Sequence, residues 1–377
     1  MLFDTEIHSC DDARRLARRY LPWMVFDYID GAAGSEFGEQ LNRDALRGIR
    51  LMPRVLNNVE QRSLGVQVFG KDMGLPFGIS PMGMCNLSRP GADLMLARLA
   101  ASRHIPQGVS TVASTSLEKI IREAQGNAWF QLYFSGDEAS SMSLVQRAES
   151  AGYETLVLTV DVPEVGRRPR ELRRGFKMPF RIGPRQFVDF ALHPAWSLSS
   201  LYYGKPDMAN FGGQHAKFDR HASRAGADWA LLDRIRSAWK GKLVIKGVLN
   251  TDDASTMKAS GVDGIIVSSH GGRQLDSAPP PILMLPQIRK AVGPDFPLFY
   301  DTGIRSGEDV VKAYALGANF VFMGRPFLYA IAGGGARGLQ QFVDVTANEI
   351  SITLAQLGLT SMRGVNAGCL YGEVPMN

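Results

Sequence analysis

Eight short apolar segments, each followed by a helix-like stretch, constrain the fold of this chain more than any other feature. The segments are rich in β-branched and aromatic residues, and Gly, Ser, Pro or Asp separates them from stretches rich in Ala and Leu. Continuous apolar runs are typical of strands buried on both faces of a parallel sheet. Eight such units predict an α/β fold, a closed (β/α)8 TIM barrel, with a doubly wound open sheet as the alternative. The expected strands are 77–80, 106–109, 128–133, 155–160, 243–246, 264–268, 297–300 and 320–323.

The region before the first strand is predicted to be helical. Asp11 or Asp12 can cap a first helix, and Pro22 separates it from a second helix that Gly31 or Gly34 can end. Crossover helices are expected at 92–103, 140–151, 252–260 and 307–316. The expected parts of a single domain, 1–377, are N-terminal helices at 1–60, the barrel at 61–360 and a long loop insertion at 161–242.

The insertion after the fourth strand is far longer than a loop and one helix require, and connections of this length are usually functional or disordered. We expect it to lie over the C-terminal face of the barrel, where barrel active sites lie. Its basic part carries a charge of +5, equal to the net charge of the chain, and is interleaved with Phe. Such a segment suits anionic lipid, nucleic acid or an acidic partner, and an ordinary solvated loop is the alternative. The basic residues are Arg167, Arg168, Arg170, Arg173, Arg174, Lys177, Arg181 and Arg185.

Composition excludes several classes of protein. No stretch approaches the roughly 18–20 apolar residues of a membrane span. Cys10, Cys85 and Cys369 are odd in number and far apart, which argues against a disulfide scaffold and for a reducing compartment. No His or Cys cluster has the spacing of a zinc site, so no metal is expected. The polar N-terminus does not resemble a secretory signal, and we expect a cytoplasmic protein.

Two Gly-Arg motifs follow the seventh and eighth expected strands, at 301–305 and 323–325. These strand ends form the usual phosphate site of barrel enzymes. Gly303 and Gly324 can expose backbone N–H groups, and the adjacent arginines can donate charge-assisted hydrogen bonds. The pair therefore predicts a phosphate site, although each motif alone is compatible with an ordinary turn.

His270 follows an apolar strand directly and precedes Gly-Gly-Arg. A neutral imidazole suits a general base near neutral pH, and Arg273 suits a bidentate contact with a carboxylate. Lys246 ends another apolar strand, where it could stabilise a developing anion or simply extend its ammonium group to solvent. The other candidates at strand ends are Pro81, Met82, Gly83, Ser110, Gln131, Tyr133, Thr159, Asp161, Arg168 and Ser268. The G-x-G-x-x-G sequence at 333–338 follows a helix-like segment, so it does not indicate a dinucleotide site.

This pattern resembles the FMN-dependent α-hydroxy acid dehydrogenases and oxidases. The most specific motif is SSHGGRQLD at 268–276, and VFDYIDGAA, WFQLY, LTVDVP, VIKGV, DTGIR and MGRP match in order. The resemblance extends from about residue 12 to about residue 359 and implies a barrel that binds FMN. The residues implied to contact the FMN ring are Pro81, Met82, Gly83, Ser110, Gln131, Thr159 and Lys246. Those implied to hold its ribityl chain and phosphate are Ser268, Asp301, Gly303, Arg305, Gly324 and Arg325.

The resemblance also implies roles toward a substrate. His270 is the implied base and Asp161 the carboxylate that stabilises its imidazolium form. Arg168 and Arg273, with the Tyr28 hydroxyl, are implied to bind the substrate carboxylate. Tyr133 is implied to hydrogen-bond the 2-oxygen.

The activity that these roles imply is oxidation of an L-2-hydroxy acid to the 2-oxo acid. The expected substrate is lactate, mandelate or a larger acid, because Val112 stands where glycolate oxidase has Trp. Gly83, where several oxidases carry Ala, favours a dehydrogenase. The phosphate turn has Thr302 where Gly or Ser is usual, a change that should be tolerated.

The implied partners are a quinone or other electron acceptor and a membrane surface contacted through 164–203. That contact would place the chain on the cytoplasmic face of the inner membrane. Family resemblance further suggests a homotetramer or larger assembly. A soluble oxidase that reduces O2 to H2O2 is the alternative. A non-redox phosphate-binding barrel is disfavoured because no cysteine nucleophile lies between Cys85 and Cys369, and nucleic-acid binding is not expected.

Overall fold

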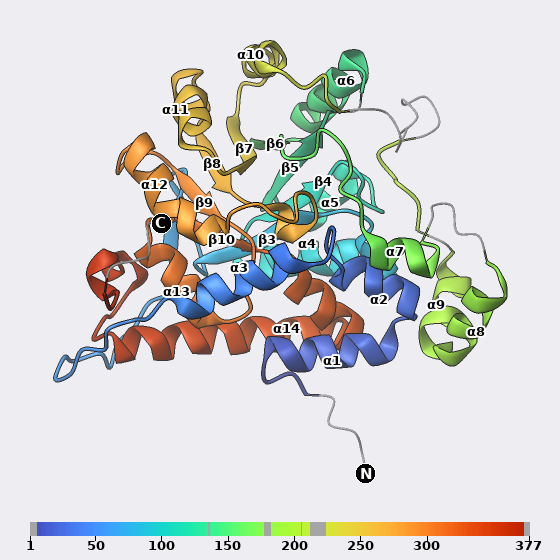
Figure 1. The fold of residues 1–377 in the computed structure, drawn as a ribbon, viewed down its shortest axis with the longest axis horizontal. Coiled ribbons are helices and arrows are strands. Elements are labelled where there is room, and N and C mark those ends of the chain that lie inside the picture. The colour runs from blue at the N-terminus through green and yellow to red at the C-terminus, as the bar shows by residue number, and fades with distance from the viewer. Residues whose placement is uncertain (1–5, 135, 177–181, 205, 212–223, 373–377) are drawn as a thin grey trace.

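The computed structural model describes residues 6–134, 136–176, 182–204, 206–211 and 224–372. Its centre is a closed barrel of eight parallel strands (Figure 1), which confirms the predicted fold and excludes the open sheet. Around the barrel the order is β10-β3-β4-β5-β6-β7-β8-β9, so first and last strands pair. The strands are β3 (Phe77–Met82), β4 (Gln107–Ser110), β5 (Ala128–Tyr133), β6 (Thr155–Thr159), β7 (Lys242–Val248), β8 (Gly264–Val267), β9 (Leu298–Tyr300) and β10 (Phe320–Met323).

A helix follows each barrel strand and covers its outer face (Figure 1). The four predicted crossover helices all form, with their ends shifted by two residues or fewer. The helices are α4 (Ala92–Arg103), α5 (Leu117–Glu123), α6 (Glu138–Ser150), α10 (Trp229–Ala238), α11 (Thr251–Ala259), α12 (Pro281–Val292), α13 (Gly307–Ala315) and α14 (Arg325–Gln356). The glycines of the G-x-G-x-x-G sequence lie inside α14, so they do not form a strand–turn–helix nucleotide loop.

The interior of the barrel is apolar at its N-terminal end and polar at its C-terminal end. Strands point alternate side chains inward, so every second residue belongs to the interior. The apolar layer includes Trp129, Val157, Val244 and Ile266, which pack in one cluster. Two residues further along the same strands lie Gln131, Thr159, Lys246 and Ser268. The strand period therefore carries these polar side chains to the C-terminal mouth of the barrel.

A short hairpin closes the opposite end. It consists of β1 (Val66–Val68) and β2 (Lys71–Met73), which pair antiparallel. Phe69 at its turn packs 5.7 Å from Trp129 and 5.5 Å from Phe299, measured between ring centroids. The turn therefore seals the apolar layer from solvent.

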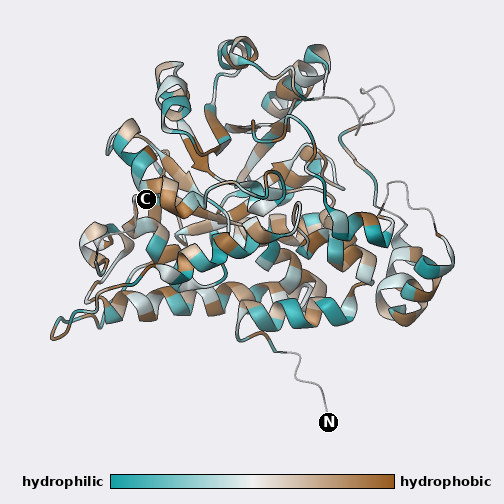
Figure 2. Ribbon diagram, viewed as in Figure 1, coloured by the Kyte–Doolittle hydropathy of each residue, from teal (hydrophilic) through white to brown (hydrophobic). Residues whose placement is uncertain are grey.

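Three helices precede the barrel: α1 (Cys10–Tyr20), α2 (Trp23–Asp30) and α3 (Phe37–Gly48). Gly31 ends α2 as predicted. The prediction of Asp11 or Asp12 as the first cap was wrong, because Ser9 is the N-cap and its hydroxyl accepts from Asp12 N. Both acids instead lie in the first turn, where their negative charges interact favourably with the positive end of the helix dipole. In Figures 1 and 2, α1 runs beside α14 with a hydrophilic outer surface.

The insertion after β6 contributes α7 (Pro169–Arg174), α8 (Pro184–Leu192) and α9 (Pro194–Tyr203) ahead of α10. α8 and α9 stand at the edge of the molecule beside α2, away from the strand ends (Figure 1). Lys177 and Arg181 lie outside the described residues. Among the helices that the structure describes, none is long and apolar enough to cross a membrane.

Two arginines of the insertion pair with acids of α2 and of the loop that follows it. Arg170 Nη2 lies 2.8 Å from Asp30 Oδ2, and Arg170 Nε lies 3.0 Å from Glu36 Oε1. Arg174 Nε lies 2.8 Å from Asp27 Oδ2. These arginines therefore hold the insertion to α2 rather than forming one continuous basic surface.

Candidate active site

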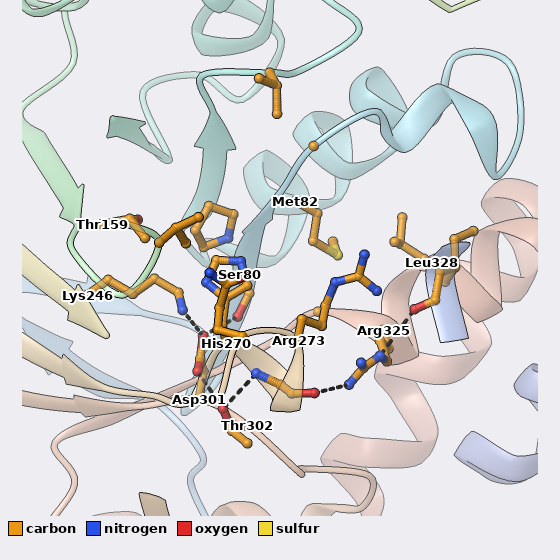
Figure 3. A pocket seen from close by; sticks show the side chains of 18 of the residues that line it. Ser80, Met82, Thr159, Lys246, His270, Arg273, Asp301, Thr302, Arg325 and Leu328 are labelled. Atoms are coloured by element: carbon orange, nitrogen blue, oxygen red, sulfur yellow. Dashed lines mark hydrogen bonds and ion pairs between the residues drawn. The ribbon is translucent and has the colours of Figure 1, made fainter. Parts of the chain in front are cut away.

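A cavity opens at the C-terminal mouth of the barrel, and most of the predicted site residues line it (Figure 3). Those on its lining are Tyr28, Pro81, Met82, Gly83, Tyr133, Thr159, Arg168, Lys246, His270, Arg273, Asp301, Gly303, Arg305, Gly324 and Arg325. Four others, Ser110, Gln131, Asp161 and Ser268, are not on the lining but contact residues that are. The structure therefore brings the predicted residues to one place.

His270 lies between a carboxylate and a phenol. Its Nδ1 is 3.0 Å from Asp161 Oδ1 and its Nε2 is 3.3 Å from the Tyr133 hydroxyl. A carboxylate at Nδ1 favours the tautomer with hydrogen on that nitrogen, which leaves the Nε2 lone pair facing the cavity. Gly247 makes the contact possible, because a Cβ there would lie 2.4 Å from Asp161 Cγ. His270 can therefore act as a base at Nε2.

Burial is the main influence on the titration of this group. It lowers the pKa of His270 below the ordinary value, an effect that the Asp161 carboxylate opposes and the Lys246 and Arg168 cations reinforce. Burial alone would raise the pKa of Asp161, but the charges of His270 and Lys246 lower it. Burial, with the charge of Asp161, raises the pKa of Tyr133. Near neutral pH the imidazole is therefore unprotonated, the carboxylate ionised and the phenol protonated.

Arg168 and Arg273 approach each other at one side of the cavity and share a buried acid. Glu171 Oε1 lies 3.0 Å from Arg273 Nη2 and 3.3 Å from Arg168 Nη1. Arg273 Nη1 also donates to the carbonyl oxygens of Tyr28 and Gly31, at 2.8 Å each. These two arginines can bind a carboxylate ligand beside Glu171.

Two aromatic rings support this side of the cavity. The Tyr28 ring stacks on Phe176, with ring centroids 4.3 Å apart and planes 7° from parallel. The Arg273 guanidinium lies 5.4 Å from the centroid of the Tyr28 ring. The N-terminal helix α2 and the insertion therefore meet here, and both contribute to the lining.

Lys246 is a buried cation at the centre of the site. Its Nζ lies 2.7 Å from Ser268 Oγ and 3.0 Å from Asp301 Oδ2. Asp301 therefore lies beside Lys246 rather than beside the arginines of the anion site (Figure 3). A buried ammonium with these two partners can stabilise negative charge that develops on a ligand above it.

The residues predicted to bind a phosphate lie together where β9 and β10 end. Gly324 is the N-cap of α14, so the positive end of the helix dipole lies at this point. Arg325 Nη1 donates to Gly271 O at 2.9 Å, and Arg305 Nη2 lies 3.1 Å from Glu39 Oε1. Both side chains line the same cavity as His270.

Thr302, where the sequence departs from the family pattern, occupies a left-handed backbone conformation with φ of +95°. Its hydroxyl donates to Asp301 Oδ1 at 3.1 Å and accepts from the N–H groups of Ser269 and Gly271, both at 3.3 Å. These hydrogen bonds stabilise the strained turn and connect it to the loop that carries His270.

Several lining residues were missed from the sequence. Phe176, Met208 and Arg224 come from the insertion, and Glu171 contacts the lining from behind. Glu171 could have been noticed, because it lies three residues after Arg168, the spacing at which helical side chains meet. Met208 and Arg224 lie in irregular segments with no periodic signal, so local sequence could not place them.

A closed barrel with an anion site after its last two strands, a buried base and two clustered arginines defines an enzyme that binds a phosphorylated cofactor and acts on a carboxylate. Comparison with known proteins specifies that class. The family model described as FMN-dependent dehydrogenase matches residues 17–371. The chain belongs to this family of oxidoreductases, and its cofactor is FMN.

Similar proteins cover the chain nearly end to end. The (S)-mandelate dehydrogenase of Pseudomonas putida is 38% identical over 97% of this chain and 94% of its own length. The L-lactate dehydrogenase of Pseudomonas syringae pv. syringae is 37% identical over 98% of this chain and 99% of its own length. A crystal structure of monotopic membrane protein (S)-mandelate dehydrogenase aligns with a TM-score of 0.93, at 37% identity over 97% of this chain and 100% of that one. A mandelate oxidase structure aligns with a TM-score of 0.82, at 35% identity over 97% of this chain and 98% of that one.

The residues of the cavity fit FMN. The Arg305 and Arg325 guanidinium groups and the start of α14 suit its phosphate. Gln131 donates from Nε2 to Thr159 Oγ1 at 2.9 Å, whereas its buried Oε1 has no hydrogen-bond partner in the described part of the chain. That oxygen is available to a ring N–H. At Gly83 a Cβ would lie 2.5 Å from Val112 Cγ2, so glycine allows the backbone on the cavity lining to pack closely against Val112.

Proposed function

We propose that this chain oxidises an L-2-hydroxy acid to the corresponding 2-oxo acid. The observation that carries the proposal is the placement of His270 Nε2 in the cavity that also contains the Arg168–Arg273 pair, Lys246 and the anion site. Base, carboxylate site and cofactor site lie at one barrel mouth. The likeness to mandelate and L-lactate dehydrogenases supports the same reaction.

When bound, FMN supplies the two-electron acceptor for the reaction. Arg168 and Arg273 hold the substrate carboxylate, and the Tyr133 hydroxyl hydrogen-bonds the 2-oxygen. His270 takes up a proton at Nε2, and Asp161 stabilises the resulting imidazolium through Nδ1. Lys246 keeps a positive charge beside the cofactor position, where it favours an anionic ring.

The remaining wall of the cavity is largely apolar and suits a substrate larger than glycolate. Val112, Val165, Phe176 and Met208 line it. Apolar side chains favour an aliphatic or aromatic substituent on the 2-carbon through burial of its surface. Lactate, mandelate and longer 2-hydroxy acids are therefore the expected substrates.

Anaerobic titration tests this function directly. We expect an L-2-hydroxy acid to bleach the visible absorbance of the FMN-loaded protein, with one equivalent of 2-oxo acid formed per flavin. Slow recovery in air, with fast recovery on adding a quinone, would indicate a dehydrogenase. Stoichiometric H2O2 would indicate the alternative oxidase. A protein that binds FMN but is bleached by no 2-hydroxy acid would contradict the proposed reaction.

We further propose that α8 and α9 contact a membrane surface and that the electron acceptor is a membrane quinone. Their exposed apolar side chains form a patch that water solvates poorly. The patch comprises Phe187, Val188, Leu192, Leu198, Leu201, Tyr202 and Tyr203, which are 54–83% exposed. Arg15, Arg18 and Arg19 are exposed on α1, which reaches α9 through Tyr20 and Ser199. Apolar insertion next to basic side chains is sufficient for peripheral binding to anionic lipid.

Vesicle sedimentation tests this contact. The protein is expected to sediment with phosphatidylcholine–phosphatidylglycerol vesicles at about 0.05 M salt and less at about 0.5 M. Leu198→Ser with Leu201→Ser should lower the partition about 10²-fold, because two apolar insertions are lost. Ile352→Ser, at an exposed position of α14, is the matched control. Equal sedimentation of both variants would rule out this patch as the contact.

A further inference from the structure

We propose that Glu171 is a positioning residue that holds the Arg168 guanidinium at the carboxylate-binding side of the cavity. This inference rests on the proposed function and explains how two like-charged side chains stay together in its substrate site. Arg168 and Arg273 both line the cavity, whereas Glu171 contacts them from behind the lining. A single oxygen of Glu171, Oε1, lies 3.0 Å from Arg273 Nη2 and 3.3 Å from Arg168 Nη1.

The two arginines are anchored unequally. Arg273 Nη1 donates to the carbonyl oxygens of Tyr28 and Gly31 at 2.8 Å each, so its guanidinium is fixed without Glu171. Arg168 has longer contacts, because its Nε donates to Arg273 O and its Nη1 to Glu171 Oε1, both at 3.3 Å. The ion pair with Glu171 is therefore the charged contact that keeps Arg168 in place.

Repulsion between the two guanidinium groups makes this contact necessary. Burial and the charge of Arg168 lower the pKa of Arg273, and the charge of Glu171 opposes both effects. Like charges repel each other more strongly in a buried site than in water, and an acid shared between them offsets that repulsion. Without the acid, we expect the less firmly held Arg168 to turn away when no substrate carboxylate is bound.

The helix that carries Glu171 is fixed on another face. Arg170 and Arg174 lie four positions apart on α7, with Arg170 Nη2 2.8 Å from Asp30 Oδ2 and Arg174 Nε 2.8 Å from Asp27 Oδ2. Glu171 is buried and lies about 100° around the helix from Arg170. The ion pairs with α2 therefore orient α7 so that Glu171 faces the two cavity arginines.

A double-mutant cycle tests the proposal, because the sign of the effect of Glu171 should depend on Arg168. In the FMN-loaded protein, Glu171→Gln should weaken binding of 2-oxopentanoate about 10-fold, since Arg168 is no longer held. In the Arg168→Met background the same substitution should strengthen binding about 3-fold, since Glu171 there only competes with the ligand for Arg273. Perturbation of the flavin absorbance measures both affinities without turnover.

Two further variants serve as controls. Glu171→Asp keeps the charge on a shorter side chain and should weaken binding less than Glu171→Gln. Glu36→Gln is the matched control, because Glu36 Oε1 lies 3.0 Å from Arg170 Nε and the substitution removes the same charge from another ion pair of α7. It should leave the affinity for 2-oxopentanoate unchanged in both backgrounds. In turnover, Glu171→Gln should raise KM for a 2-hydroxy acid more than it lowers kcat.

The outcomes of the cycle are distinct from those that test the proposed function. An equal change in affinity from Glu171→Gln in the wild-type and Arg168→Met backgrounds is the result of a merely structural role, and it would overturn the positioning role while leaving the proposed function intact. A wild-type protein that binds FMN but not 2-oxopentanoate would overturn the positioning role as well. If no L-2-hydroxy acid is oxidised, the proposed function fails, and the binding cycle still decides whether Glu171 holds Arg168 toward a carboxylate.

Discussion

Replacing His270 by Gln should lower kcat about 10²–10⁴-fold, the usual contribution of a positioned general base. Gln keeps a polar side chain of similar reach but cannot take up the proton that His270 Nε2 receives. The Asp161 carboxylate would then contact a neutral amide, so the charge pair of the active form cannot arise. Steady-state and single-turnover kinetics with the best substrate measure the effect.

The pH profile identifies the residue behind this loss. In the wild-type protein the unprotonated imidazole is active, so kcat/KM should fall as the pH drops through the pKa of His270, which burial lowers below 6.5. This acidic limb should be absent in His270→Gln. In Asp161→Asn it should move to lower pH, because the carboxylate that favours the imidazolium is gone, and kcat should fall as well.

Two controls keep this result interpretable. Residue 270 has φ of +56°, a conformation that Asn tolerates better than most residues, so His270→Asn tests for backbone strain. FMN binding should persist in both variants, because the anion site is built from Arg305, Arg325 and the start of α14. A His270→Gln protein that retains FMN and turns over within tenfold of wild type would exclude His270 as the base.

The second large effect concerns two arginines only two positions apart. Arg168→Met should lower kcat/KM about 10²–10³-fold, since the substrate carboxylate loses a charged partner. Thermal stability should change little, because the folded-state partners of Arg168, Glu171 Oε1 and Arg273 O, are both 3.3 Å away. The effect should appear mainly in KM for a monocarboxylate substrate.

Arg170→Met is the matched control, because it removes the same charge from a position two residues further along, inside α7. Arg170 does not line the cavity but contacts Asp30 and Glu36 at 2.8 and 3.0 Å. Its loss should lower the free energy of unfolding by about 1–3 kcal/mol and leave KM near the wild-type value. Denaturant unfolding and kinetics on both variants measure the two effects. If the effects of the two substitutions were exchanged, the assignment of Arg168 to the substrate site would be wrong.

Local sequence was sufficient to predict the barrel and most of the residues that lie at the candidate site. All eight strands and four crossover helices formed close to their predicted positions, because buried parallel strands need continuous apolar runs that few other structures require. His270, Lys246 and Asp301 could be placed together because each directly follows or ends a strand. The carboxyl ends of parallel strands meet at one face of a barrel, so adjacency to a strand predicts proximity in space.

The arrangement of the insertion could not be predicted from local sequence in the same way. Its arginines are alike in sequence, yet Arg168 faces the cavity while Arg170 and Arg174 pair with acids of α2 and the loop that follows it. Nothing in the local pattern distinguishes them, because their partners lie more than 130 positions away along the chain.

The sequence by itself therefore determined the barrel, the mouth that carries the chemistry, and the strand-end residues that fit FMN. Only the tertiary structure decided which basic residues line the cavity, that Glu171 lies between Arg168 and Arg273, and that Arg224 reaches Tyr133. The physical reason is the range of the interactions. Strand period and turn chemistry act between near neighbours, whereas the packing of an irregular insertion depends on contacts that form only when distant segments meet.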